Sequence, residues 1–259
     1  MQALHQLDAT NKIIISNVLT KGKTFDEAGM VEERLPFTVK IVRSEETLRK
    51  AVFIRHAAYG RHVPALAELL KAPEANDHDE GSVVLLAESK LDGSPLGTMR
   101  IQTNRYRKLS IEQSADLPDW LQDKSLAEAT RLGIALGRIG RIVKTVLFKA
   151  YFQYCWAENI DWMVIGARTP LDRHYEALLF QDVFPGQLIP LRHAGNIPHR
   201  ILAFELETAK DRWTEANHPL LGFMCNTHHA DIDVSVDDGP FLGEMVPTTR
   251  SSNTIRAML

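Results

Sequence analysis

A short apolar segment, residues 126–134, leads directly into a long amphipathic pattern, residues 138–159, with glycines at 133, 137 and 140. The first segment predicts a strand. Apolar residues then recur at steps of three and four, which predicts a helix whose core face holds Ile139, Ile142, Val143, Val146, Leu147, Ala150, Tyr151 and Tyr154. A strand, a glycine turn and a helix start can aim backbone N–H groups and a partial positive charge at an anion. The pattern therefore predicts a strand–turn–helix unit that faces a phosphate.

Basic residues occupy another face of the predicted helix. At about 100° per residue, Arg138, Arg141 and Lys149 fall within roughly an 80° arc, and we expect this arc to be exposed. Basic residues on an outer helix face are usually only solvated. Beside a turn that holds a phosphate, the same arc suits an acidic partner that carries a phosphate-linked arm. Both interpretations remain open from the sequence.

Composition sets the class of protein. The 259 residues are 44% hydrophobic and 24% charged, as in ordinary soluble globular proteins. A net charge of −3 and the absence of a zinc-finger, RRM or KH signature argue against nucleic-acid binding. The N-terminus lacks a signal-peptide pattern, and the longest apolar stretch, Val83 to Ala87, is too short to span a bilayer. We expect a cytoplasmic protein in which Cys155 and Cys225 are reduced thiols.

The remaining segments alternate between strand and helix patterns. They predict helices that begin near Ser44, Ala65 and Pro170, and strands over residues 37–42, 82–87, 96–103, 162–167, 187–191 and 201–206. This order predicts an α/β (α+β) fold with a mixed sheet flanked by helices. We divide the chain into an N-terminal arm (1–36), one main domain (37–206) and a C-terminal helical extension with a polar tail (207–259).

Four motifs in this order resemble those of the GNAT acyltransferase superfamily. They are Phe53-Ile54-Arg55, Asp77-His78-Asp79, Gly97-Thr98-Met99-Arg100 and Glu128-Ala129-Thr130-Arg131. Within the superfamily the resemblance, which covers residues 37–206, is to autoinducer synthases and to N-acyl amino acid synthases that use acyl carrier protein. It implies a splayed central sheet. The segment from His174 to Phe180 also resembles the superfamily helix whose tyrosine, here Tyr175, protonates the departing thiolate.

The sequence departs from the family pattern in two places. The usual coenzyme A loop is missing from residues 131–141, whereas amides of Gly137, Arg138 and Gly140 could still hold one phosphopantetheine phosphate. This favours acyl carrier protein over coenzyme A as the donor. Autoinducer synthases also carry an aromatic-rich segment for S-adenosylmethionine, where this chain has only Ala57-Ala58-Tyr59-Gly60. An ordinary amino acid is therefore the expected acceptor.

The resemblance implies roles for individual side chains. Glu128 is the candidate base for the acceptor ammonium; the alternative is an ion pair with Arg131 or Arg100. The substrate-binding candidates are Arg55, Asp79, Arg100 and Arg131. Of these, Arg55 and Arg100 could hold the acceptor carboxylate, because guanidinium groups bind carboxylates in bidentate fashion.

Alternatives stand beside these roles too. Arg55 and Arg100 could instead pair with Asp77 or Asp79, and Tyr175 could be an ordinary buried tyrosine. The expected carrier-binding residues are Gly137, Arg138, Gly140, Arg141 and Lys149. An apolar acyl tunnel is expected between the splayed strands, with the candidate lining residues Val83, Leu85, Ile134 and Val164.

The sequence thus predicts an N-acyltransferase that moves a long-chain acyl group from acyl carrier protein to an amino acid. It predicts no bound cofactor beyond the acyl-phosphopantetheine thioester as co-substrate. It also predicts no metal, because the spacing of His218, His228, His229, Asp231 and Asp233 fits no zinc or iron pattern. The alternatives are an acyl-homoserine-lactone synthase that uses S-adenosylmethionine and a non-catalytic acyl or carrier-protein binding module.

Overall fold

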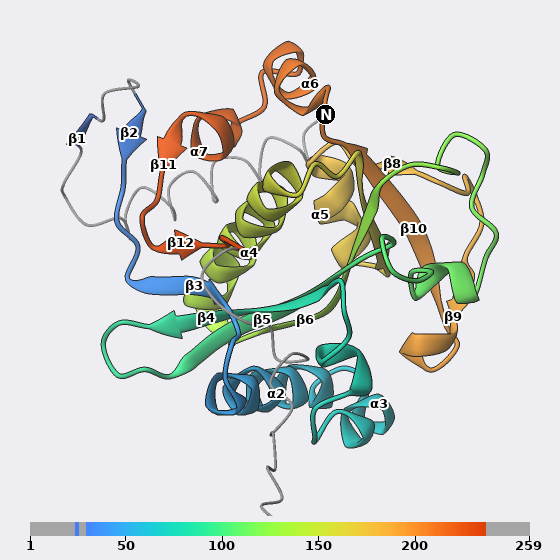
Figure 1. Cartoon of the computed structure of the whole chain (residues 1–259), viewed down its shortest axis with the longest axis horizontal. Coiled ribbons are helices and arrows are strands. Elements are labelled where there is room, and N and C mark those ends of the chain that lie inside the picture. Colours follow the sequence, from blue (N-terminus) through green and yellow to red (C-terminus); the bar gives the residue numbers. More distant parts are fainter. Residues whose placement is uncertain (1–23, 26–29, 237–259) are drawn as a thin grey trace, which may run out of the picture.

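The computed structural model describes residues 24–25 and 30–236. Its main sheet has the order β12-β3-β4-β5-β6-β7-β10-β8, with β9 paired to β10 (Figure 1). The strands are β3 (Phe37–Ile41), β4 (Ser82–Ser89), β5 (Pro95–Thr103), β6 (Leu126–Ile134), β7 (Trp162–Ala167), β8 (Gln181–Asp182), β9 (Ile189–Leu191), β10 (Ile197–Glu205) and β12 (Ile232–Asp233). Neighbouring strands are antiparallel except for the β6–β7 and β12–β3 pairs. The predicted mixed sheet is therefore confirmed.

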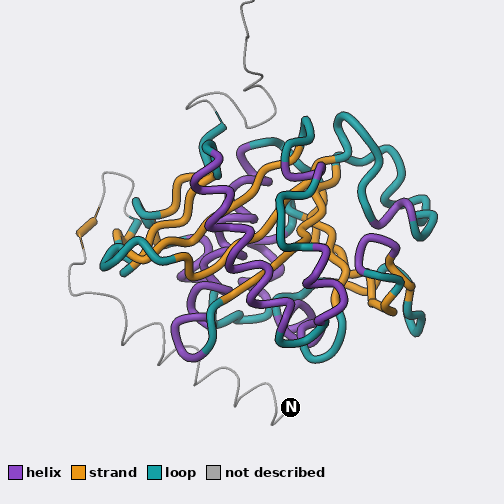
Figure 2. Tube along the Cα trace, turned by 90° about the horizontal axis from the view of Figure 1, so that it is seen from below, coloured by secondary structure: helices purple, strands orange, loops and turns teal. Residues whose placement is uncertain are grey.

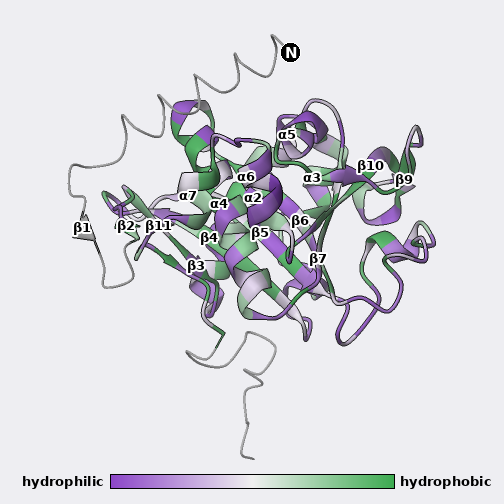
Figure 3. Cartoon of the chain, turned by 90° about the horizontal axis from the view of Figure 1, so that it is seen from above, coloured by the Kyte–Doolittle hydropathy of each residue, from purple (hydrophilic) through white to green (hydrophobic). Residues whose placement is uncertain are grey.

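Helices cover both faces of this sheet. The view from below in Figure 2 looks onto α2 (Glu45–Gly60) and α3 (Pro64–Leu69). The opposite face, viewed in Figure 3, carries α4 (Gly137–Ala157), α5 (Leu171–Ala177), α6 (Ala209–Glu215) and α7 (Leu221–Cys225). Three short 3-10 turns, η1 (Ala75–Asp77), η2 (Ile111–Gln113) and η3 (Arg192–Ala194), lie in the connections.

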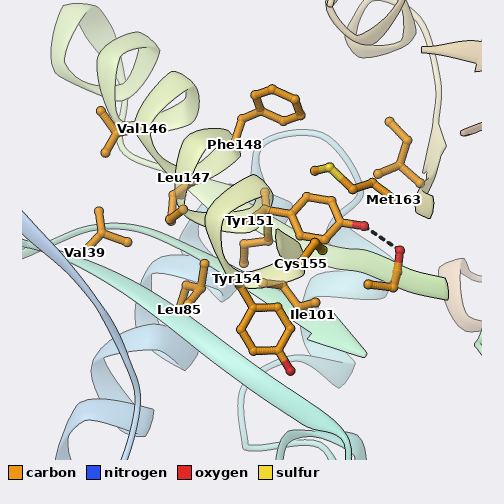
Figure 4. Close-up of a cluster of buried hydrophobic side chains, with 14 of the residues drawn as sticks. Val39, Leu85, Ile101, Val146, Leu147, Phe148, Tyr151, Tyr154, Cys155 and Met163 are labelled. Atoms are coloured by element: carbon orange, nitrogen blue, oxygen red, sulfur yellow. Dashed lines mark hydrogen bonds between the residues drawn. The ribbon is translucent and has the colours of Figure 1, made fainter. Parts of the chain in front are cut away.

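The helix α4 forms because its apolar residues share one face, as the periodicity predicted. Figure 3 shows hydrophobic and hydrophilic positions along it. Val146, Leu147 and Tyr151 are buried against strand residues such as Leu85 and Ile101, and these side chains make up the largest core cluster (Figure 4). Burial of this face fixes α4 on the sheet, and with it the position of the turn that connects β6 to α4.

The sheet splits between β6 and β7. Their parallel pairing runs from Leu126 and Trp162 only as far as Ala129 and Ile165, although both strands continue. Tyr151 lies at the paired end, where its hydroxyl donates to Ala127 O at 2.5 Å and accepts from Val164 N at 3.2 Å. The Tyr151 hydroxyl thus bonds to backbone groups of both strands, where direct β6–β7 backbone hydrogen bonds would otherwise form. The splayed sheet expected from the sequence is therefore present.

A β-bulge lies on β6 beside the split. Thr98 pairs with Gly133 and Arg100 with Thr130, so two residues of β6 oppose one residue of β5. One of the two is Arg131, whose φ of 56° lies in the left-handed region that non-glycine residues rarely adopt. The bulge changes the direction of the side chains that follow it, and local strain of this kind is often found at functional sites.

The C-terminal extension is helical in α6 and α7, as expected, but it also supplies strands. β12 joins the edge of the main sheet beside β3, and β11 (Thr227–His228) joins a small sheet with β2 (Val31–Glu32) and β1 (Thr24–Phe25). Two-residue strands carry too little alternation to be predicted from the sequence. The polar tail, residues 248–259, and most of the predicted arm, residues 1–23 and 26–29, lie outside the described residues.

Candidate active site

Glu128 lies on β6 just before the split and is fully buried. Its Oε2 accepts a hydrogen bond from Ile111 N at 3.1 Å, on the turn η2. Its Oε1 is buried without a hydrogen-bond partner, and the nearest imidazole nitrogen is His193 Nε2, at 3.8 Å. A buried acceptor atom with no donor is costly, and a catalytic role is one explanation for its presence.

Burial also changes how Glu128 and His193 titrate. Loss of solvent raises the pKa of Glu128 to about 7, although backbone N–H groups and the charges of Arg100 and Arg131 oppose the shift. Burial and the same two arginines lower the pKa of His193 to about 4. At neutral pH the imidazole is therefore neutral, while Glu128 is divided between its two protonation states. A general base is most effective when its pKa lies near the working pH.

A charged cluster adjoins Glu128 on the same face of the sheet. Arg55 makes a bidentate pair with Asp77, with distances of 2.8 and 2.9 Å. Arg131 makes a second bidentate pair, with Glu74, at 2.6 Å for each bond. Arg100 joins the two pairs through contacts of 3.1 Å to Glu74 and 3.2 Å to Asp77.

This cluster holds three guanidinium groups against two carboxylates. Burial alone would raise the pKa values of Glu74 and Asp77, but the arginines hold both below their usual values. One positive charge is therefore in excess. Arg100 uses Nε for Thr130 and Nη1 for the acids, and no hydrogen bond is found for its Nη2 among the described residues. This nitrogen is free to bind a further anionic group.

The ion pairs of the three arginines decide between the alternatives that the sequence left open. Arg131 and Arg100 pair with Glu74 and Asp77, so the alternative of a Glu128 ion pair with either arginine is wrong. Arg55 forms the alternative pair with Asp77, which uses both of its terminal nitrogens.

Asp79 does not reach these arginines. It contacts Arg107 Nη1 at 2.5 Å, away from the cluster. Two residues were missed by the sequence prediction, namely Glu74 and His193. Glu74 lies three residues before Asp77, and this acidic spacing was a usable signal. His193 carried no such signal, because its position depends on the long-range fold of the β9–β10 hairpin.

The start of α4 is open to solvent. Leu136, Gly137, Arg138 and Arg141 are exposed, as expected for an anion-binding turn. Gly140 is a correction, because this fourth residue of α4 is buried, whereas the expected role needs an amide open to solvent. A Cβ at Gly140 would lie 1.9 Å from Ala135 O, so this glycine provides clearance for the turn.

Lys149 is a second correction, because the expected exposure of this residue is wrong. Its side chain is fully buried, and Nζ donates to the backbone carbonyls of Phe223 and Thr227, each at 2.5 Å. Helical periodicity placed it correctly on the basic arc, but the C-terminal extension covers that part of the arc. Lys144, one turn nearer the helix start, lies beside Arg141, and burial lowers its pKa to about 8.

Tyr175 lies on α5, on the opposite face of the sheet from Arg55. It is buried, with its ring edge-on to Phe180 at 5.4 Å between centroids. Burial raises the pKa of its hydroxyl well above the usual value, and Tyr59 of α2 is the further cause. Tyr59 belongs to α2, which lies on the other face of the sheet (Figure 1). No hydrogen bond is found for the Tyr175 hydroxyl among the described residues.

The expected tunnel lining is wrong as a single set. Val83, Leu85 and Ile134 pack in the core cluster beneath α4, whereas Val164 packs in a second cluster on the opposite face. Neighbouring residues of a strand face opposite sides of the sheet. On β7, Met163 and Ile165 therefore face the cluster beneath α4, and Val164 between them faces the other side.

The histidines and acids of the extension have structural contacts. His229 Nδ1 lies 3.0 Å from Lys149 Nζ, and Asp231 accepts from Leu35 N at 2.8 Å and contacts Lys90 at 2.6 Å. Within residues 24–25 and 30–236, no three His, Cys, Asp or Glu side chains are grouped to hold a metal ion. In the same part of the chain, no helix combines the length and apolar character needed to cross a bilayer.

Comparison with solved structures identifies the fold. The chain is similar to FeeM, an N-acyl amino acid synthase from uncultured soil microbes, with a TM-score of 0.54 and 16% identity over 70% of this chain and 96% of that chain. It is also similar to BjaI, a CoA-dependent acyl-homoserine lactone synthase solved with SAM and isopentyl-CoA, with a TM-score of 0.50 and 16% identity over 80% and 96% of the two chains. No protein-family model and no curated protein matches the sequence. The chain has the acyltransferase-type GNAT fold.

Proposed function

We propose that this protein is an N-acyltransferase that moves a long-chain acyl group from acyl carrier protein to the α-amine of an amino acid. The observation that carries the proposal is Glu128, a fully buried carboxyl group with an unpaired oxygen and a pKa of about 7 at the split of a GNAT-type sheet. Amide formation from a thioester needs a base at this point, because the acceptor enters as an ammonium ion.

The charges beside Glu128 suit an α-amino acid. Arg100 and Glu128 lie on one face of the sheet, since Arg100 pairs with Thr130 and Gln102 with Glu128. The acceptor carboxylate binds Arg100 Nη2, which the internal pairs leave free, and the excess positive charge of the cluster favours it. The ammonium then faces Glu128. Arg55 and Arg131 act through Asp77 and Glu74 to hold this arrangement.

The exposed start of α4 suits the donor. Amides of Gly137, Arg138 and the following residue carry no helical bond and face solvent with the partial positive charge of the helix. A single phosphopantetheine phosphate binds there. Arg138 and Arg141, with Lys144 in place of Lys149, form the basic surface on which an acidic carrier protein docks.

The reaction requires three further steps. Glu128 takes a proton from the ammonium, and the amine nitrogen attacks the thioester carbon. The resulting oxyanion is stabilised by β6 backbone N–H groups at the split. The carbon–sulfur bond then breaks, the Tyr175 hydroxyl protonates the thiolate, and the second proton of the amine nitrogen restores the phenol. The proton held by Glu128 is released to solvent. The elevated pKa of Tyr175 keeps it protonated at neutral pH.

Reconstitution tests this function. Purified protein is incubated with palmitoyl–acyl carrier protein and an equimolar mixture of the twenty amino acids, and the products are identified by mass spectrometry. An N-acyl amino acid that is formed by the wild type and lost in Glu128→Gln is the expected result. Absence of any acylated amino acid contradicts the proposal. Replacing the donor by palmitoyl-coenzyme A in a parallel reaction tests the preference for carrier protein.

The structural likeness to BjaI favours a second candidate, acyl-homoserine-lactone synthesis from S-adenosylmethionine. The two functions differ in one requirement. If product appears only when S-adenosylmethionine is added, and is an acyl-homoserine lactone, the second candidate replaces the first.

A further inference from the structure

His193 carries the imidazole that lies nearest to the unpaired oxygen of Glu128. It lies in the turn η3 between β9 and β10, and its Nε2 is 3.8 Å from Glu128 Oε1. Glu128 Oε1 is buried without a hydrogen-bond partner, and no hydrogen bond is found for His193 Nε2 among the described residues. The other ring nitrogen, Nδ1, does not face Glu128 in this pair and is buried and unpaired as well. An unused acceptor such as Glu128 Oε1 is costly to maintain in the interior unless a ligand completes it.

The turn that carries His193 is held in place by the site itself. Arg131 Nη2 donates to the backbone oxygen of His193 at 3.0 Å, and Ser114 Oγ accepts from Arg192 N at 3.0 Å. Gly195 and Asn196 reverse the chain with φ values of 72° and 57°. The imidazole position is therefore coupled to the same arginine that pairs with Glu74.

The separation of the two atoms fits a bridging nitrogen. Atoms 3.8 Å apart are too distant for a direct hydrogen bond. A nitrogen placed about 2.8 Å from each would make two normal hydrogen bonds. An ammonium group has enough N–H donors for both, and the imidazole is neutral and able to accept because burial lowers its pKa to about 4.

We propose that His193 Nε2 and Glu128 Oε1 together bind the acceptor ammonium and each take one of its protons, so that His193 is a second catalytic residue. This inference rests on the proposed acyl transfer. Glu128 takes the first proton, and the freed amine forms the nitrogen–carbon bond. The nitrogen of the tetrahedral intermediate then carries a positive charge and gives its second proton to His193.

The atoms and charges balance. As the carbon–sulfur bond breaks, the imidazolium proton passes to the pantetheine thiolate, directly or through Tyr175. The proton on Glu128 is released to solvent. An ammonium and a thioester thereby become an amide, a thiol and one proton.

The kinetic test uses the full-length chain with palmitoyl–acyl carrier protein and the amino-acid mixture. His193→Gln keeps polar groups but cannot exchange protons, so we expect kcat to fall about 100-fold with little change in KM. Added imidazole restores part of the activity of His193→Ala. The control is His199→Gln on the same hairpin, where Nδ1 contacts Ile197 O at 2.6 Å instead of Glu128. A kcat of His193→Gln equal to that of the wild type overturns the proposal. An equal loss of kcat in His193→Gln and His199→Gln, with no rescue of His193→Ala by imidazole, also overturns it.

A second measurement does not depend on turnover. The ¹⁵N shifts of His193 and the ¹³C shift of the Glu128 carboxyl group are recorded with the amino-acid mixture and unacylated carrier protein. Both shifts move in the wild type, and the Glu128 change is smaller in His193→Gln. Shifts that stay fixed overturn the shared ammonium site even where product forms. Shifts that move without any product support the shared site and contradict only the proposed acyl transfer.

Discussion

The environment of a residue decides its chemistry at this site, and Glu128 and Glu74 illustrate this. Both are glutamates close to the same arginines. Glu74 makes bidentate bonds to Arg131, and its pKa is held below the usual value. Glu128 receives only backbone hydrogen bonds, and its burial raises its pKa to about 7. One carboxylate is therefore a permanent counter-ion, whereas the other can exchange a proton near neutral pH.

The first prediction concerns the dependence of the rate on pH. With donor and amino acids saturating, kcat falls about tenfold per pH unit below pH 7, because only ionised Glu128 can accept the ammonium proton. Initial rates between pH 5.5 and 8, read as released thiol, measure this. The Glu128→Gln variant is expected to lose most of its activity, and its remaining rate no longer falls as the pH drops below 7. A wild-type rate that is constant over this range contradicts the role of Glu128.

The second prediction concerns stability. The pKa of Glu128 is raised by folding, so its contribution is fully present below about pH 4.5 and is lost as pH rises through about 7. Over that range the wild type loses about 3 kcal/mol relative to Glu128→Gln. Urea unfolding of both proteins at pH 5 and pH 8 measures this difference, and contributions from titrating groups that lie away from Glu128 largely cancel in the comparison. An equal difference at both pH values would show that Glu128 titrates normally.

The sequence pointed to several residues of the candidate site, but it did not show which side chains they contact. Glu128 and Arg131 were found because a short motif on one strand fixes their spacing. Arg55 and Arg100 were found as well, but the sequence could not tell whether a substrate or an internal acid occupies them. Their partners come from a separate turn, and His193 comes from a hairpin more than sixty residues away from Glu128. These contacts depend on which distant segments the fold brings together, and a local sequence pattern carries no information about that.

At the scale of elements, α4 both closes the core and shapes the split. Its length and buried face were predictable because the 3.6-residue period extends over many turns. Its contact with the β6–β7 ladder was not, since Tyr151 reads in the sequence as one more apolar position. The hydroxyl group bonds to Ala127 O and Val164 N, within the short stretch over which the two strands pair before they diverge.

The third prediction tests this contact. Tyr151→Phe leaves Ala127 O and Val164 N without their partner in the interior, so the free energy of unfolding falls by about 1–3 kcal/mol. The matched control is Tyr154→Phe on the same helix (Figure 4), because no hydrogen bond is found for the Tyr154 hydroxyl among the described residues. Urea unfolding followed by circular dichroism compares the two variants. Equal losses would indicate that the Tyr151 hydroxyl has no special part in joining the strands.

At the scale of the whole molecule, the C-terminal extension belongs to the body of the protein. It supplies the edge strand β12, two carbonyl acceptors for Lys149 and the indole of Trp213. The sequence predicted a helical extension with a polar tail and no strands in it, because weak local patterns give no sign of long-range pairing. The extension also explains why only Arg138 and Arg141 of the predicted basic arc remain exposed.

The fourth prediction follows from Trp213, which is fully buried and stacks on Phe204 at 5.2 Å between ring centroids. Its indole N–H donates to Leu178 O at 3.2 Å, so it joins the extension both to β10 and to the segment after α5. Trp213→Ala removes this packing and is expected to cost about 3–5 kcal/mol, a large part of the stability of a typical domain. Trp156→Ala is the control, because that side chain is 61% exposed. Thermal unfolding of the two variants measures the difference. Similar melting temperatures would mean that the extension contributes little to the fold; a much lower value for Trp213→Ala would mean that the main domain, predicted over residues 37–206, does not end at residue 206.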